Sequence, residues 1–98
     1  MSPELAHLIE DRRNEILRIA RVHGVGRVAV FGSFARGDAT ENSDVDFLID
    51  VTGPTTPWFP GGLVADLEEL LGRRVDVAEE KALREDIRST VLTEAKPL

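Results

Sequence analysis

The stretch RVAVFGSFARGDATENSDVDFLIDV, residues 27–51, constrains the fold more than any other part of the chain. It holds two runs of strand-forming residues, 27–33 and 44–51, and apolar and acidic side chains alternate in the second run. Because side chains alternate across a strand, Asp44 and Asp46 share the face opposite Val45, Phe47 and Ile49. If the two strands pair as antiparallel neighbours, the Gly-Ser that closes the first lies beside these two aspartates.

Helical periodicity and chain-breaking residues place the other elements. The apolar stripe of the first helix is interrupted at Arg12 and Arg13, which either extend from the core edge towards water or face a partner; the first is favoured. The expected elements are helices over about 3–22, 62–71 and 81–95, a helical turn over 33–36, a third strand over 73–79 and a Pro/Gly-rich loop over 52–62. The prediction is an α/β (α+β) fold, a mixed sheet of about three strands flanked by about four helices, in one domain over residues 1–98.

The turn after the first strand has the features of an anion-binding corner. Gly32 permits close approach of the backbone, and Ser33 opens a helical turn whose unpaired N–H groups suit a phosphate. Arg36 lies three residues further on, hence on the same side of the turn, where its guanidinium can reach further phosphate oxygens. We expect Gly32, Ser33 and Arg36 to bind a phosphate-bearing ligand.

The acidic residues of the second strand suggest a metal site beside that corner. Two carboxylates about 4 Å apart repel by roughly 4 kcal/mol at an effective dielectric of 20, so a cation is expected between them. Carboxylate oxygens suit Mg²⁺ or Mn²⁺, and Asp76 in the third strand can join Asp44 and Asp46 if that strand flanks the second. Asp50 shares the face but lies about 13 Å from Asp46, too far to share an ion.

Composition excludes several other classes of protein. The chain has no cysteine, which removes disulfides and thiolate chemistry. A formal net charge of −6 disfavours an extended nucleic-acid interface, because phosphate neutralisation dominates such binding. No apolar run approaches the length of a membrane helix, so a cytoplasmic protein without membrane contact is the expectation.

The residues Gly32-Ser33, ten intervening positions and Asp44-Val45-Asp46 resemble the G-S-x10-D-x-D signature of the DNA polymerase β-like nucleotidyltransferase superfamily. The fuller stretch GSFARGDATENSDVDFLID is most similar to the minimal nucleotidyltransferases, including the antitoxins paired with HEPN ribonuclease toxins. The resemblance covers nearly the whole chain, because Asp76 stands where the family's third aspartate is expected.

The resemblance implies an activity and a site. Asp44, Asp46 and Asp76 would be catalytic and would hold two Mg²⁺ ions, or Mn²⁺, with Asp76 helping to activate the attacking hydroxyl. Gly32, Ser33 and Arg36 would bind the triphosphate of ATP. The implied reaction is transfer of AMP to a hydroxyl, expected on a tyrosine of a cognate HEPN toxin, as the antitoxin of a type VII-like pair.

Two alternatives stay open at this point. The same fold could neutralise its partner by binding alone, with Trp58 and Phe59 as interface anchors, although packing of these aromatics onto the core is equally compatible. The second alternative is a small-molecule nucleotidyltransferase of the kind that modifies aminoglycosides, but such enzymes carry an additional C-terminal domain. The sequence leaves the base specificity and the oligomeric state, homo- or hetero-oligomeric, undetermined.

Overall fold

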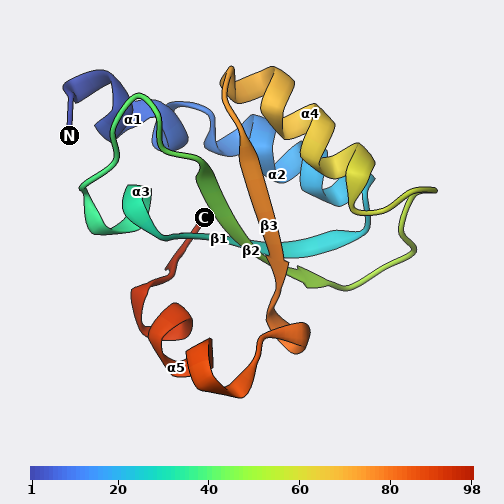
Figure 1. The fold of residues 1–98 in the computed structure, drawn as a ribbon. Coiled ribbons are helices and arrows are strands. Elements are labelled where there is room, and N and C mark those ends of the chain that lie inside the picture. The colour runs from blue at the N-terminus through green and yellow to red at the C-terminus, as the bar shows by residue number, and fades with distance from the viewer.

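A computed structural model describes residues 1–98 as a mixed β-sheet with helices on both sides (Figure 1). The strands are β1 Val25–Phe31, β2 Val45–Val51, β3 Val75–Glu79 and β4 Lys96–Pro97. The helices are α1 Pro3–Asp11, α2 Arg13–Val22, α3 Ser33–Arg36, α4 Gly61–Leu71 and α5 Glu85–Glu94, with a 3₁₀ turn η1 over Glu80–Ala82. The sheet order is β3-β2-β1-β4, with β2 antiparallel to β1 and parallel to β3. The α/β class is confirmed, with one strand and one helix more than expected.

The main core lies between the sheet and helices α1, α2 and α4, whereas α5 lies on the opposite side (Figure 1). Phe47 and Ile49 of β2 pack with Ile16 of α2 and with Leu63 and Leu67 of α4, and none of the five is more than 2% exposed. Burying such a side chain stabilises the fold by about 1.5–3 kcal/mol. A one-residue slip of β2 would expose these groups, so the core fixes which face carries the aspartates.

The N-terminal helix predicted over 3–22 is wrong in one respect, because two helices occupy this span. Arg12 leaves helical geometry with φ −111° and ψ 11°, and its N–H bonds to the carbonyl of Ile9 in a tight turn. Both arginines are exposed: Arg12 pairs with Glu15 at 3.3 Å, and Arg13 donates to the carbonyl of Leu98. The interrupted apolar stripe was the signal of this break.

The C-terminal segment also differs from the prediction of one helix over 81–95. Leu83 and Arg84 are extended, with ψ of 134° and 142°, so α5 begins only at Glu85. Lys96 and Pro97 then pair with β1 as a fourth strand, and the Leu98 N–H donates to the Val28 carbonyl at 2.9 Å. Two residues are too few to show alternation, so the sequence gives no signal of this strand.

The loop between β2 and α4 is held at its middle by a buried histidine. His23 places Nδ1 2.6 Å from the Thr56 hydroxyl and Nε2 2.8 Å from the Asp66 carboxylate. Of the two aromatic residues in this loop, Phe59 packs against the core and Trp58 is 91% exposed. None of the helices is both long and apolar enough to span a membrane.

Candidate active site

The expected phosphate corner begins where β1 ends. Phe31, the last residue of β1, pairs with Asp46 of β2, so Gly32 lies directly beside that aspartate. Gly32 has φ 71° and ψ −151°, a backbone region that is essentially restricted to glycine. A Cβ at Gly32 would collide with the Asp46 carboxylate. The glycine therefore allows the Asp46 side chain to lie against the backbone, as the sequence predicts.

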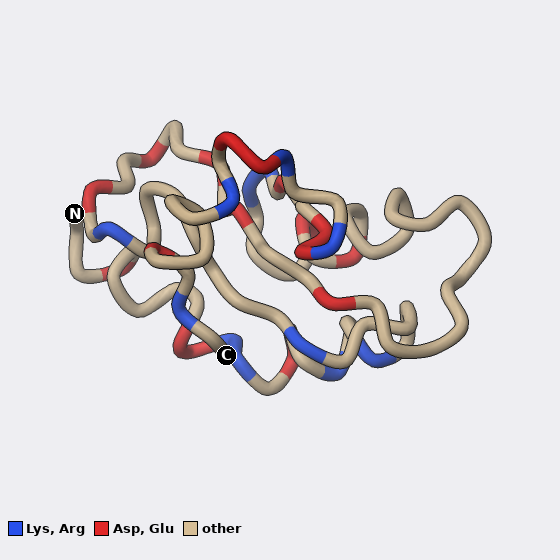
Figure 2. The backbone as a smooth tube through the Cα atoms, turned by 90° about the horizontal axis from the view of Figure 1, so that it is seen from below, with Lys and Arg blue, Asp and Glu red and all other residues tan.

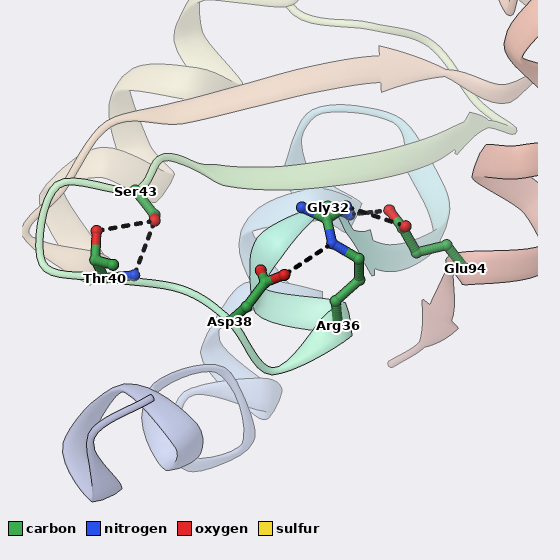
Figure 3. Close-up of polar contacts among 6 residues, drawn as sticks. All are labelled: Gly32, Arg36, Asp38, Thr40, Ser43 and Glu94. Carbon is green, nitrogen blue, oxygen red and sulfur yellow. Dashed lines mark hydrogen bonds and ion pairs between the residues drawn. The ribbon is translucent and has the colours of Figure 1, made fainter.

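A single helical turn, α3, carries the rest of the corner. The turn is stopped by Gly37, which has φ 85° and whose N–H bonds to the Ser33 carbonyl at 3.0 Å. The expected turn over 33–36 is thereby confirmed. Arg36 at its end is half-exposed and forms ion pairs with Asp38 and Glu94, at 3.2 and 3.1 Å (Figure 3). The hydrogen bonds that Arg36 donates, to Glu94 first and then to Asp38, raise the pKa of its guanidinium, so the group is positively charged.

Three aspartates, two in strands and one directly before a strand, lie beside the corner. Asp46 and Asp76 are register partners on the parallel strands β2 and β3, so their side chains share one face of the sheet. Asp44 precedes β2 by one residue and is two positions from Asp46, on the same side. Arg74 is the basic residue nearest to Asp44, with 3.9 Å between Nε and Oδ1, but its side chain is 84% exposed. The topology thus brings together the three aspartates that the sequence singled out.

The electrostatics of this cluster are unfavourable for a negative charge on Asp46. Burial raises the pKa of Asp46, and the charges of Asp76 and Asp44 raise it further. Arg36 lowers it, but this is the smaller effect. Such a cluster of carboxylates at the edge of a sheet is typical of functional sites, where a bound cation supplies the missing positive charge.

The donor atoms of the cluster fit a hard divalent cation, since they are carboxylate oxygens. The side chains are not already gathered around a common point: the structure contains no group of three or more acidic or histidine side chains at metal-ligating distances. The backbone therefore places the three aspartates as neighbours, and holding an ion requires their side chains to close around it.

Glu94 is the site residue that the sequence reasoning missed. It is the last residue of α5, and its two carboxylate oxygens accept from the Gly32 N–H at 2.6 Å and from Arg36 Nη1 at 3.1 Å (Figure 3). It lies 62 positions from Gly32 along the chain, and no local pattern marks it. Only the fold shows that the end of α5 lies at the phosphate corner.

The loop that leads into Asp44 is organised by its own polar residues. The Ser43 hydroxyl accepts from the Thr40 N–H at 2.9 Å (Figure 3), and Arg73 donates to the Ser43 carbonyl at 3.3 Å. The Val45 N–H then donates to the Arg74 carbonyl at 2.9 Å. These bonds hold the chain on both sides of Asp44.

Comparison with known proteins agrees with this arrangement. Residues 13–98 match the nucleotidyltransferase domain family, so the chain belongs to that family. It is 44% identical over 71 residues to the protein adenylyltransferase MntA of Thermococcus cleftensis, covering 72% of each chain. It is 33% identical over 87 residues to a Methanocaldococcus jannaschii protein, MJ0435, that is provisionally named a protein adenylyltransferase, covering 89% of this chain and 94% of that one.

Solved structures show the same fold. A protein provisionally named a minimal nucleotidyltransferase superposes with a TM-score of 0.82 at 42% identity, over 95% of both chains. A chain of a toxin-antitoxin crystal structure with AMP-PNP superposes with a TM-score of 0.72 at 22% identity, over 90% of this chain and 70% of that one. The family and the named relatives together support an enzyme of the adenylyltransferase class.

Proposed function

We propose that this chain, acting as one catalytic domain, is the antitoxin of a HEPN-type toxin and inactivates it by transferring AMP from ATP to a tyrosine hydroxyl. The observation that carries the proposal is the convergence of Gly32, Ser33 and Arg36 with three aspartates at one edge of the sheet. The relatives support it by name, since two are called protein adenylyltransferases and a structural neighbour is a toxin-antitoxin complex with AMP-PNP.

The phosphate groups of ATP are bound by the corner in this proposal. The Gly32 N–H and the Arg36 guanidinium donate to phosphate oxygens, and the Ser33 hydroxyl is a third donor. The guanidinium of Arg36 carries a permanent positive charge and can stabilise the leaving pyrophosphate. The acceptor oxygen forms a bond to the α-phosphorus, and the bond from that phosphorus to the pyrophosphate oxygen breaks.

The aspartates are proposed to hold Mg²⁺, with Mn²⁺ as a substitute. Two ions would be bound by Asp44, Asp46 and Asp76, and they would neutralise phosphate charge and favour ionisation of the acceptor hydroxyl. Asp76 is exposed, whereas Gly32 is buried. In this proposal the acceptor approaches from the side of Asp76, whose carboxylate takes up the hydroxyl proton and passes it to water.

A protein acceptor from another chain suits this geometry. The chain contains no tyrosine, so a tyrosine acceptor must come from a partner. An extended nucleic-acid partner is disfavoured, because the net charge is −6 and Figure 2 shows basic and acidic positions interspersed along the backbone.

Label transfer tests the proposal. The chain is incubated with α-labelled ATP, Mg²⁺ and the HEPN-type protein encoded by a neighbouring reading frame. We expect label on a tyrosine of that protein and none after Asp46→Asn substitution, whereas Asp50→Asn, a matched change on the same face of β2, retains transfer. Transfer that persists in Asp46→Asn, or label confined to small molecules, would contradict the proposal.

Neutralisation by binding alone is a second candidate, favoured by one observation. Trp58 is 91% exposed and has φ 66°, an uncommon backbone region for a large side chain. An exposed aromatic on a loop held by His23 and Thr56 is suited to contact a partner. If Asp46→Asn still neutralises the toxin at equal concentration while Trp58→Ala does not, binding is the mechanism.

A further inference from the structure

The phosphate corner contains a negatively charged group from the chain itself. The Glu94 carboxylate bridges the Gly32 N–H and the Arg36 guanidinium, at 2.6 and 3.1 Å, with one oxygen on each donor (Figure 3). Its side chain is 19% exposed, so the contact is partly shielded from water. A carboxylate with two oxygens on two donors makes the same kind of contact that a phosphate group makes with an N–H and an arginine.

Glu94 and a phosphate group cannot use this corner together. A backbone N–H carries one proton, and the short contact from Gly32 already commits it to Glu94. A phosphate oxygen arriving there would also place two anions side by side, next to the aspartates. The charge of Glu94 already contributes to the raised pKa of Asp46, so the carboxylate is within electrostatic range of the metal-site residues.

The element that carries Glu94 is weakly attached to the rest of the fold. Val91 is the only buried residue of α5. The helix follows the extended residues Leu83 and Arg84, whereas the chain after it is fixed to β1 by Lys96 and Pro97. Displacing the last turn of α5 therefore disrupts little of the core. The pairing of β4 with β1 keeps this turn near the phosphate corner, so Glu94 can bind there again.

We propose that Glu94 is an internal occupant of the phosphate site, which ATP displaces on binding. The inference rests on the proposed role of Gly32 and Arg36 in binding the triphosphate, and it adds regulation of that site. In the free protein the carboxylate satisfies both donors and blocks the corner. When ATP enters, the phosphates take both donors, and the end of α5 is released from the corner.

The affinity for ATP, measured by titration calorimetry in the presence of Mg²⁺, tests this inference. If about nine molecules in ten have the corner blocked, Glu94→Gln tightens ATP binding about tenfold, because apparent affinity falls with the competent fraction. Glu85→Gln removes the same charge from an exposed position on α5 and is expected to leave the affinity within about twofold. Arg36→Ala weakens binding in either background.

Amide hydrogen exchange on the unmodified chain is a second measurement that needs no variant. Saturating ATP is expected to increase exchange over residues 85–94 while it protects residues 32–36. Either result overturns the inference: unchanged or slower exchange over 85–94 on saturation with ATP, or an affinity of Glu94→Gln for ATP that is equal to or weaker than that of wild type. A weaker affinity of that variant would mean that Glu94 positions Arg36 for the nucleotide instead.

The two proposals fail in different ways. If wild type binds ATP and Arg36→Ala weakens binding, but Glu94→Gln does not tighten it, only the blocking role of Glu94 is refuted. If neither wild type nor Glu94→Gln binds ATP, the nucleotide site itself is wrong and the inference falls with it.

Discussion

Asp46 and Asp50 lie four residues apart on the same face of β2, yet their surroundings are opposite. Asp50 is buried and accepts from Arg27 at 2.9 Å, with Lys81 at 3.8 Å on its other oxygen. Asp46 is half-buried beside Gly32, and its pKa is raised by burial and by two neighbouring aspartates. Asp50 therefore has basic partners that neutralise its charge, whereas the charges around Asp46 are mostly negative.

This difference separates a structural carboxylate from a candidate catalytic one. Alternation along β2 places the two residues on the same face, and they are of the same type. What differs is whether the chain itself neutralises the charge. A half-buried carboxylate whose nearest charges are mostly of its own sign is stabilised by an external cation, as is expected at a metal-binding site.

The largest expected effect is on catalysis. Asp46→Asn should lower the rate of AMP transfer by at least about 10³-fold, because it removes a ligand and a charge from the reacting centre. Asp50→Asn should leave the rate within about threefold, since Arg27 and Lys81 already occupy that carboxylate. Single-turnover rates with labelled ATP measure both. If both variants lose the same share of the transfer rate, the different surroundings of Asp46 and Asp50 do not reflect different roles in catalysis.

The next effect concerns the contact between Gly32 and Asp46. Gly32→Ala should lower AMP transfer by about 10²-fold and the free energy of unfolding by about 2–3 kcal/mol, because its backbone conformation excludes other residues and the new methyl group meets Asp46. Gly37→Ala is a matched control: it also has a positive φ but nothing lies within 4 Å of the added Cβ. Its expected cost is about 1 kcal/mol. Thermal unfolding of both variants checks the difference, and equal costs would show that the collision is unimportant.

A smaller effect is expected when Asp50 loses its charge. Asp50→Asn should lower the free energy of unfolding by about 1 kcal/mol, since the ion pair is partly buried but the Arg27 side chain is 74% exposed and screened. Urea denaturation measures this change. If the free energy of unfolding of Asp50→Asn equals or exceeds that of wild type, the ion pairs of Asp50 do not stabilise the fold.

The smallest effect has the opposite sign. Asp46→Asn should raise the free energy of unfolding at neutral pH by at most about 1 kcal/mol, once solvent screening is allowed for. A raised pKa in the folded state means that ionised Asp46 costs stability as pH rises through that pKa. The advantage of the variant should therefore shrink on acidification and vanish below the ordinary value of 3.8. A constant advantage across this range would exclude Asp46 as its source.

Much of the fold follows from local patterns, and the site follows from their arrangement. Strict alternation identified β2, and the Gly-Ser pair at the end of β1 located the corner, because both signals are local. The pairing of Asp46 with Asp76 needed only the assumption that β3 flanks β2. No local signal marks Glu94 or the two residues of β4, because only tertiary structure brings them to the site or the sheet.

The break at Arg12 shows a different limit of sequence reasoning. Residues 3–22 have helical composition throughout, and the core decides whether one helix or two bury the apolar side chains. The interruption of the stripe was visible, but its interpretation required knowing that Arg13 reaches the chain end at Leu98. Tertiary contacts, which cannot be read from the sequence, determine that residues 3–22 form two helices.

We propose above that the aspartate cluster and the corner form one site for ATP with Mg²⁺. Titration calorimetry of ATP against wild type, Asp46→Asn and Asp50→Asn, each with Mg²⁺ and again with EDTA, tests it most directly. We expect Mg²⁺ to strengthen ATP binding in wild type and in Asp50→Asn, and this strengthening to be lost in Asp46→Asn. Binding that is indifferent to Mg²⁺, or that Asp46→Asn leaves unchanged, would contradict it.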